Sequence, residues 1–425
     1  MPASEQRKQL NSWKEIASVL GVSVRTTQKW EAERGLPVRR SAGEKGRVSA
    51  SLDELEQWQA ANLRKREWWH NPVLIRAYAL VATALVLAAV GLGVTSRLIS
   101  QRKGPPALSR LESNFLIVTD SQGRELWRHG FSYLFAPGAY ADQVAKGDRW
   151  AWFGNLDRDP EVEMLFVYHP VGRDPAGASL ICYGKGGREK WRFSAGRPVS
   201  DRAGAYSRDY RIATFLVADV AGTGSPQILV SSQHVSGHPN QFVLLSSDGK
   251  VLGEYWHSGH LPELNVADLD GDGRLEILLA GVDSGYREAT LIALDPAHAT
   301  GASQQPAGDV HQLQGFPPAA EKARLLFPRT CTNRTLDEFN QAAHLIVRDG
   351  LIELAVTERE GHPANRAIYT FGANLRVANV RFSDEWRRYH RELELKRVLD
   401  HPLTDEEMQR LATPEIIADP ARAGS

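Results

Sequence analysis

One long run without charged residues limits what this chain can fold into more than any other feature. Residues 77–96 read AYALVATALVLAAVGLGVTS, which is 20 positions with no Asp, Glu, Lys or Arg. A helix of this length rises about 30 Å, which matches the thickness of the hydrocarbon core of a bilayer. The run also lacks the polar face of a helix that covers a soluble core. We therefore predict one transmembrane helix at residues 77–96.

The residues before this run predict its direction across the membrane. Residues 1–72 contain 13 Lys and Arg against 9 Asp and Glu. Segments with an excess of basic residues tend to stay in the cytoplasm. We expect a single-pass protein of the inner membrane, with the lipid bilayer as one partner. Its amino-terminal side faces the cytoplasm and its carboxyl-terminal side faces the periplasm.

The sequence predicts a multidomain fold with a small α-rich domain, one transmembrane helix and an all-β domain that ends in helices. The predicted segments are a DNA-binding domain (1–62), a juxtamembrane linker (63–76), the transmembrane helix (77–96), a second linker (97–110), a β domain (111–382) and a helical tail (383–425). The net charge of the whole chain is zero. The charge of each segment therefore has to be considered separately.

The first segment predicts two short helices with a tight turn between them. Ser12 and Glu15 form a capping box, Gly21 ends the first helix, and Ser23 can cap the second. This arrangement is a helix-turn-helix. The second helix carries side chains that suit phosphates and base edges, namely Arg25, Thr26, Thr27, Gln28 and Lys29.

A two-stranded hairpin with a basic tip and a third helix are predicted next. The strings WKEIASVLGVSVRTTQKWEAERGLPVRR and RVSASLDELEQW resemble the winged helix-turn-helix of the MerR and excisionase families over about residues 10–60. The resemblance implies binding to DNA, often as a homodimer, through a recognition helix and a wing. The implied contact residues are Arg25, Thr26, Thr27, Lys29, Arg39, Arg40, Lys45 and Arg47. A helical domain that contacts another protein is the alternative.

One loop of the β domain has the carboxylate spacing that Ca²⁺ requires. In the string NVADLDGDGRLEILL, Asp268, Asp270, Asp272 and Glu276 stand at relative positions 1, 3, 5 and 9. Arg274, at position 7, can offer its backbone carbonyl. Apolar runs on both sides predict strands and disfavour an EF-hand. We predict a structural Ca²⁺ ion here, with an Asp/Gly turn that binds no ion as the alternative.

The same loop recurs in weaker copies, and a second motif alternates with it. The copies lie at residues 155–163, 219–227 and 349–353, and glycine turns followed by tryptophan strands lie at 119–127, 183–191 and 246–256. Four or five units of roughly 50–75 residues fit this β domain. The loops resemble FG-GAP or VCBS repeats of integrin-type propellers, and the turns resemble quinoprotein-like propellers. The resemblance implies a β-propeller, and a second ion at residues 155–163 stays open.

The remaining chemistry of the chain predicts no enzyme. Scattered Ser, Asp and His residues lack a nucleophile elbow or a similar signature, and a group of four histidines lacks the spacing of a metal site on a helix. These histidines are His234, His238, His257 and His260. Cys182 and Cys331 either pair in an oxidising periplasm or stay as free buried thiols. Thr404 begins a second capping box in the helical tail.

Together these features predict a membrane-anchored one-component transcriptional regulator. Its cytoplasmic domain binds DNA, and its periplasmic propeller senses an unknown ligand or partner protein. The layout resembles regulators of the ToxR or CadC type in architecture. The alternative is a membrane-tethered binding or adhesion protein whose first domain docks a cytoplasmic protein instead of DNA.

Overall fold

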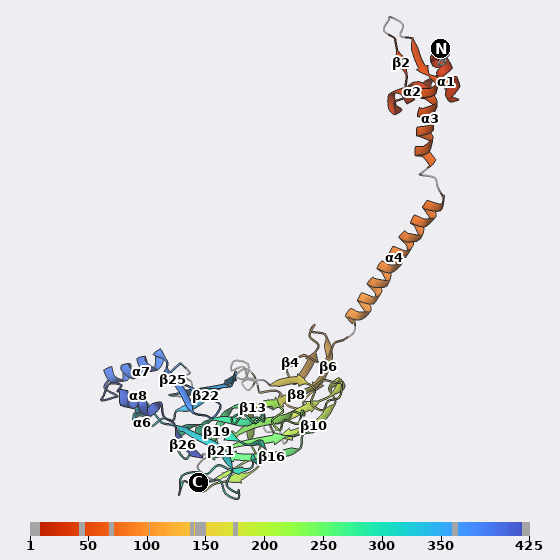
Figure 1. The fold of residues 1–425 in the computed structure, drawn as a ribbon. Helices are drawn as coiled ribbons and strands as arrows, with labels where there is room; N and C mark the ends of the chain where they lie inside the picture. Colours follow the sequence, from red (N-terminus) through yellow and green to blue (C-terminus); the bar gives the residue numbers. More distant parts are fainter. Residues whose placement is uncertain are drawn as a thin grey trace. The chain divides into compact units, whose positions relative to one another are not determined.

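The computed structural model describes residues 9–41, 47–67, 72–101, 103–136, 140, 150–172, 177–358 and 364–418. The chain forms two compact units, which are Met1–Arg102 and Lys103–Ser425 (Figure 1).

The first unit begins with two short helices whose ends follow from the sequence. Helix α1 (Trp13–Leu20) starts at Ser12, whose Oγ accepts a hydrogen bond from the Glu15 N–H at 3.3 Å. Helix α2 (Val24–Arg34) starts in the same way at Ser23. Gly21 ends α1 at φ 66°, a left-handed conformation that costs glycine little. The predicted N-caps Ser12 and Ser23 are confirmed, while Glu15 accepts a hydrogen bond from the Asn11 N–H at 2.9 Å in place of the Ser12 N–H.

A small sheet and a third helix complete the core of this unit. Its three antiparallel strands, in the order β1-β3-β2, are β1 (Gln9–Leu10), β3 (Val48–Ser51) and β2 (Arg39–Arg40). Helix α3 (Leu52–Glu67) follows β3 directly. Trp58 of α3 lies 5.5 Å from the Trp30 ring of α2, and its Nε1 donates to the Arg34 carbonyl at 3.0 Å. These contacts hold α3 against α2.

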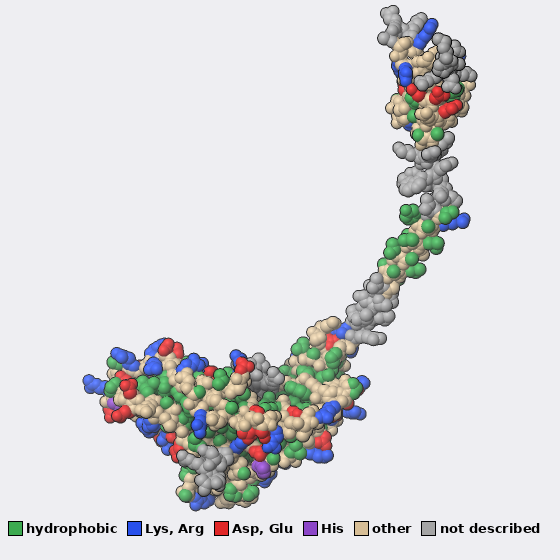
Figure 2. Space-filling view, in the orientation of Figure 1, with side chains coloured by type: hydrophobic (Ala, Val, Ile, Leu, Met, Phe, Trp, Pro, Cys, Tyr) green, Lys and Arg blue, Asp and Glu red, His purple; other side chains and the backbone are tan. Residues whose placement is uncertain are grey.

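A long helix, α4 (Pro72–Gln101), contains the run that was predicted to cross a membrane. This prediction is corrected, because no helix among the described residues is both long and apolar enough to span a bilayer. A helix that crosses a bilayer needs about 20 apolar residues in succession. Apolar side chains of α4 such as Leu80 and Leu87 are exposed, and Figure 2 shows hydrophobic side chains on the surface of this helix. The predicted fold class is corrected accordingly to a small α-rich unit and a mostly β unit.

Five sheets follow one another along the second unit (Figure 1), and their strand pairs are antiparallel except for one parallel pair in sheet 3. Sheet 1 contains β4 (Leu108–Glu112), β5 (Phe115–Thr119) and β6 (Glu125–Gly130). Sheet 2 contains β7 (Ala151–Gly154), β8 (Glu163–Tyr168), β9 (Ser179–Tyr183) and β10 (Glu189–Ser194). Sheet 3 contains β13 (Tyr210–Ala218), β14 (Gln227–His234), β15 (Asn240–Leu245), β16 (Val251–His257) and β20 (Gly301–Ala302).

The last two sheets have the same meandering order. Sheet 4 contains β17 (Gly259–Ala267), β18 (Glu276–Asp283), β19 (Glu288–Leu294), β21 (Glu321–Phe327) and β26 (Glu415–Ala418). Sheet 5 contains β22 (Gln341–Arg348), β23 (Leu351–Thr357), β24 (Arg366–Phe371) and β25 (Val377–Phe382). A separate two-stranded pair contains β11 (Val199–Ser200) and β12 (Ala205–Tyr206).

Neighbouring sheets pack face to face, because successive side chains of a strand point to opposite faces. In β14, Ile228 and Val230 lie in the core shared with sheet 2, while Leu229 lies in the core shared with sheet 4. Four such cores connect sheets 1 to 5 in order. Among the described residues no core joins sheet 5 to sheet 1, and these sheets lie at opposite ends of the unit (Figure 1). The result is an open, β-propeller-like row of sheets.

The glycine and tryptophan motif joins one sheet to the next. The Trp127 ring of sheet 1 lies against Gly187 of sheet 2, where a Cβ atom would come within 2.6 Å of the ring. Trp191 of sheet 2 lies against Gly249 of sheet 3 at the same separation, and its Nε1 donates to the Ser247 carbonyl at 2.9 Å. Both glycines have a positive φ. A side chain at either position would therefore strain the turn and collide with the ring.

Short helices and one returning strand cover the carboxyl-terminal end of the row. The helices are α6 (Cys331–Leu336), α7 (Asp384–Leu395) and α8 (Asp405–Leu411). Thr404 caps α8, as predicted. Strand β26 was not predicted, and it pairs antiparallel with β21 of sheet 4. Residues 420–425, for which fraying was expected, lie outside the described residues.

Candidate functional sites

The side chains of α2 separate into an exposed face and a buried face. Arg25, Gln28 and Lys29 are exposed, and their spacing of three or four positions places them on one face. Thr26 is half-buried beside this face, and its Oγ1 lies 2.8 Å from the Ser23 Oγ. Thr27 is fully buried, and its Oγ1 donates to the Ser23 carbonyl at 3.1 Å. The prediction that Thr27 contacts DNA is therefore wrong, because the helix turns this side chain into the core.

The basic residues of the hairpin are mostly paired with carboxylates. Arg39 lies 2.8 Å from Glu54, and Arg40 donates two hydrogen bonds to Glu31 at 3.2 and 2.8 Å. Arg47 is also exposed. Among the described residues of this unit, no carboxylate lies within salt-bridge distance of Arg25 or Arg47. Lys45, the other predicted wing residue, lies outside the described residues.

Three loops at the same place in sheets 2, 3 and 4 share one local geometry. We call residues 155–163 and 268–276 the acidic loops and residues 219–227 the neutral loop. Each loop connects the first two strands of its sheet. The side chain at position 9 accepts a hydrogen bond from the backbone N–H at position 2 in all three. The distances are 3.0 Å from Leu156 to Glu163, 2.9 Å from Val220 to Gln227 and 2.7 Å from Leu269 to Glu276.

The side chain at position 1 also stabilises each loop through its backbone. Asp268 accepts hydrogen bonds from the N–H groups of Gly271 at 2.7 Å and Gly273 at 3.0 Å. In the neutral loop, Asp219 accepts from Thr223 at 3.0 Å and also from Gly224. These carboxylates therefore form Asx-type turns and already have hydrogen-bond partners in the chain.

In each acidic loop, the ammonium group of one lysine lies between two carboxylates. Lys322 of β21 lies 2.7 Å from Asp270 and also donates to Glu276. Lys190 of β10 lies 2.6 Å from Asp157 and 3.1 Å from Glu163. The hydrogen bonds to these carboxylates raise the pKa of Lys322 and lower the pKa of Asp270. The chain thus supplies a cation at the place where the sequence predicted Ca²⁺.

Only part of the predicted Ca²⁺ ligand set comes together. Asp268, Asp270 and Glu276 each place one oxygen within 4.8 Å of the others. Asp272 instead accepts a hydrogen bond from the Arg274 side chain at 3.0 Å. Ca²⁺ takes six to eight oxygen ligands, whereas two of the three convergent carboxylates hold the lysine. Ca²⁺ at this loop stays a prediction, and an ion would have to displace the ammonium group.

Two of the four histidines named from the sequence, His257 and His238, have different neighbours in the structure. His257 is fully buried and lies 3.6 Å from the Asp283 carboxylate, whose pKa burial raises to about 6. His238 instead lies beside His311, with ring centres 5.0 Å apart, and near Asp201. His311 is 73 positions after His238 in the sequence. Local spacing therefore could not reveal this neighbour.

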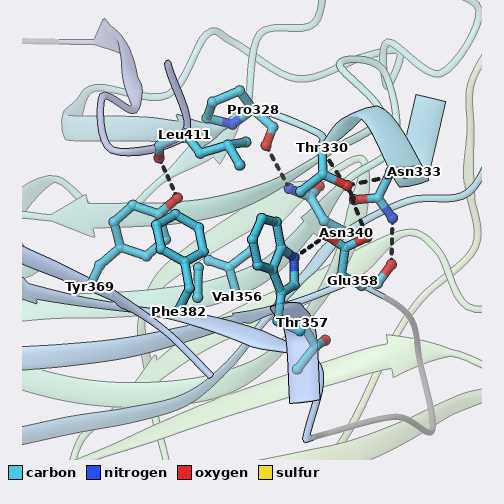
Figure 3. A pocket seen from close by; sticks show the side chains of 12 residues that line it. Pro328, Thr330, Asn333, Asn340, Val356, Thr357, Glu358, Tyr369, Phe382 and Leu411 are labelled. Atoms are coloured by element: carbon cyan, nitrogen blue, oxygen red, sulfur yellow. Dashed lines mark hydrogen bonds between the residues drawn. The ribbon is translucent and has the colours of Figure 1, made fainter. Parts of the chain in front are cut away.

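A buried carboxylate lies under α6, where sheet 5 meets the carboxyl-terminal helices (Figure 3). Glu358 accepts a hydrogen bond from Thr330 Oγ1 at 2.9 Å and another from Trp386 Nε1. Burial raises its pKa to about 7. The adjoining cavity measures about 10 Å³, which is room for one water molecule at most. This network connects α6 and α7 to sheet 5 and leaves no space for a substrate.

The two cysteines are free and buried, and they lie in different elements of the β unit. Cys182 lies in β9 and Cys331 begins α6. The sequence left open a disulfide or two free thiols, and in the structure both thiols are free. Burial raises the pKa of both thiols to about 12.

Comparisons with known proteins find only distant structural similarity. The amino-acid sequence matches no known protein family and no curated protein. BamB from Moraxella catarrhalis is similar in structure at 12% identity and a TM-score of 0.34, over 66% of this chain and 62% of that chain. BBS1N in complex with ARL6DN is similar at 11% identity and a TM-score of 0.27, over 67% of this chain and 84% of that chain. A likeness this distant assigns no activity to the chain.

Proposed function

We propose that the first unit binds duplex DNA and that the chain acts as a DNA-binding regulator whose β unit binds a ligand or a partner protein. One observation supports this proposal most directly. Arg25, Gln28 and Lys29 form an exposed polar face on α2, and a hairpin with Arg39, Arg40 and Arg47 belongs to the same small unit. We propose that α2 enters the major groove and that the hairpin contacts the backbone, as in a winged helix-turn-helix.

The chemistry of α2 suits a phosphate backbone. The N–H groups at the start of a helix and its positive dipole favour anions, and Arg25 stands in this first turn. The ion pairs of Arg39 and Arg40 are exposed to solvent. Such pairs contribute only about 0–1 kcal/mol, so phosphate oxygens can replace the carboxylates at little cost.

A second candidate function is the docking of another protein. It is favoured by the mixed charge of the surface, where Lys29, Arg39 and Arg40 each lie beside a glutamate. The glutamates of such a surface repel a phosphate backbone, whereas they can pair with basic residues of a partner protein. The two candidates differ in their dependence on salt, since DNA binding releases counterions.

Titration of the full chain into a labelled duplex of mixed sequence, at several salt concentrations, tests the proposal. Loss of each phosphate contact should reduce the slope of log K against log salt by about 1. We expect Arg25→Ala and Lys29→Ala together to weaken binding and to flatten this slope. Lys185→Ala and Lys250→Ala together, which remove two exposed positive charges from the β unit, are the matched control.

An equal loss of affinity in the control would mean that only net charge matters. Undetectable binding of the unaltered chain at low salt would contradict the proposal and favour the docking of a protein. The homodimer expected from the sequence would appear as two chains for each duplex in the same titration.

A further inference from the structure

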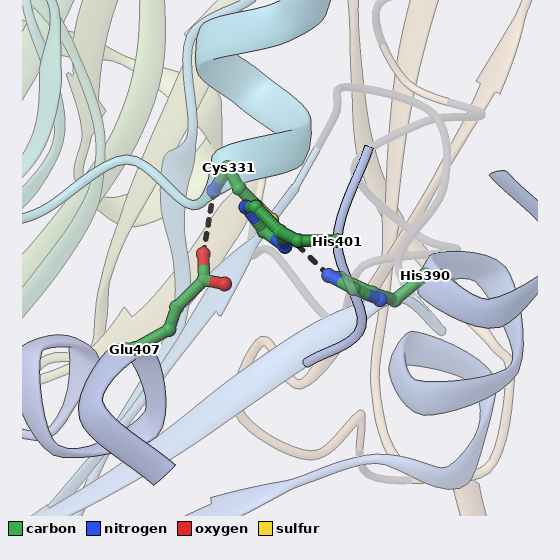
Figure 4. A group of neighbouring side chains, drawn as sticks. All are labelled: Cys331, His390, His401 and Glu407. Atoms are coloured by element: carbon green, nitrogen blue, oxygen red, sulfur yellow. Dashed lines mark hydrogen bonds between the residues drawn. The ribbon is translucent and has the colours of Figure 1, made fainter. Parts of the chain in front are cut away.

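Four elements at the carboxyl-terminal end each bring one potential metal ligand to the same point (Figure 4). Cys331 begins α6, His390 lies in α7, His401 lies between α7 and α8, and Glu407 lies in α8. One ligand atom from each lies within 4.8 Å of the other three. The Cys331 Sγ and the His390 Nε2 are 3.1 Å apart. We infer that these four side chains bind one transition-metal ion, with Zn²⁺ as the best fit.

Both histidines have the orientation of metal ligands. His390 Nδ1 lies 2.8 Å from the Glu394 carboxylate, which leaves Nε2 toward the thiol. His401 Nδ1 lies 3.1 Å from the Pro402 carbonyl, which leaves its Nε2 free of that contact. Metal-binding histidines almost always engage their other ring nitrogen with a carboxylate or a carbonyl in this way. Glu394 and the Pro402 carbonyl thus fix the two rings.

The carboxylate and the thiol complete a donor set that suits Zn²⁺. Glu407 Oε1 accepts a hydrogen bond from the Cys331 N–H at 2.7 Å, so Oε2 remains for an ion. One sulfur, two imidazole nitrogens and one carboxylate oxygen match the ligand types and the number of a closed tetrahedral zinc site. Soft sulfur and imidazole donors disfavour Ca²⁺ and Mg²⁺. Binding releases the thiol proton to solvent, since the thiolate is the ligand.

The packing around the cluster gives an ion a structural role. Apolar contact between α6, α7 and the following turn is limited to a small cluster of Cys331, Leu393 and Leu399 with Tyr389. Polar contacts also join these elements, as between Arg410 and the Arg329 carbonyl at 3.1 Å. An ion held by ligands from α6, α7 and α8 would join these short helices more strongly than this apolar cluster can.

Metal analysis of the full chain after exposure to Zn²⁺ and desalting tests the inference. We expect about one zinc for each chain, and the visible spectrum of tetrahedral, thiolate-bound Co²⁺ when Co²⁺ replaces zinc. Cys331→Ser should abolish the sulfur-to-cobalt band. Cys182→Ser is the matched control, because it removes the other buried thiol from a sheet without these ligands. Equal zinc content in the unaltered chain and in Cys331→Ser would overturn the inference.

Two further variants keep the test valid if the cysteine variant fails to fold. His401 is exposed, so His401→Ala should leave the fold intact and remove the increase in melting temperature that Zn²⁺ gives. His298→Ala removes another exposed histidine and should keep the increase. Glu394→Gln should weaken zinc affinity by about 10–100-fold, because it loosens the ring of His390. No change in zinc affinity for both His401→Ala and Glu394→Gln would overturn the inference.

Discussion

The acidic loops and the neutral loop have the same backbone hydrogen bonds but differ in charge at several positions together. The acidic loop of sheet 4 has Asp270 at position 3 and Glu276 at position 9, where the neutral loop has Ala221 and Gln227. Opposite each loop, the fourth strand of the sheet (β10, β16 or β21) has one extra residue at a register shift. This residue is Lys190 and Lys322 beside the acidic loops but Leu252 beside the neutral loop.

The other two sheets extend the comparison. Sheets 1 and 5 have no acidic loop of this kind, and the residues at the corresponding register shifts, between β5 and β6 and between β24 and β25, are Leu126 and Ala378. Lysine therefore occurs at this position only where two carboxylates face it. The comparison teaches that the carboxylates and the lysine form one unit. A loop with the spacing of a Ca²⁺ site can be neutralised by its own chain.

The largest effect is expected when the lysine alone is removed. Lys322→Met leaves the buried Glu276 without its cation, and breaking such a pair is costly. We expect a loss of about 2 kcal/mol in the free energy of unfolding, below the value for a fully buried pair because Lys322 is partly exposed. Chemical denaturation measures this loss. In this variant, Ca²⁺ should restore part of the stability, since it can now take the place of the ammonium group.

An acidic residue placed in the neutral loop should have a somewhat smaller effect. Gln227→Glu keeps the hydrogen bond to Val220 but adds a charge that no lysine faces. We expect it to cost about 1–2 kcal/mol, because a buried charge without a partner is unfavourable. Leu252→Lys in the same chain should recover most of this loss, while Leu252→Lys alone should not stabilise. A double-mutant cycle measures the coupling, and a coupling near zero would break the comparison.

A smaller effect is expected from Ca²⁺ on the unaltered chain. Because Lys190 and Lys322 already hold the carboxylates, an ion gains little by displacing them. We expect the melting temperature to stay nearly constant between excess Ca²⁺ and a chelator. A clear increase with Ca²⁺ would show that the ion displaces the lysine, and the site predicted from the sequence would then hold.

The smallest effect is expected at position 5 of the acidic loop. Asp272 is exposed and, among the described residues, pairs with the neighbouring Arg274. Exposed pairs contribute at most about 1 kcal/mol, and usually less. Asp272→Asn should therefore change the free energy of unfolding by less than about 0.5 kcal/mol. A loss as large as that of Lys322→Met would mean that Asp272 takes part in binding an ion.

Features set by neighbours in sequence were predictable, and features set by distant partners were not. Ser12, Gly21 and Thr404 act within one helical turn, so their caps could be read directly. Lys322 lies 46 positions from Glu276, and Glu407 lies 76 positions from Cys331. No local spacing links such residues. Thr27 was misplaced for a different reason, since a threonine suits either a groove or a helix core and only packing decides between them.

The pairing of β26 with β21 has a consequence for how the molecule opens. Strand β21 leads into α6, sheet 5 and the last helices, and β26 then returns to the side of β21. The segment between these two strands therefore begins and ends at strands that are hydrogen-bonded to each other. The carboxyl-terminal segment can therefore separate completely from sheet 4 only after the hydrogen bonds between β21 and β26 break. Amide hydrogens of β26 should exchange no later than those of sheet 5, so the last short strand acts as the latch that sets when this end unfolds.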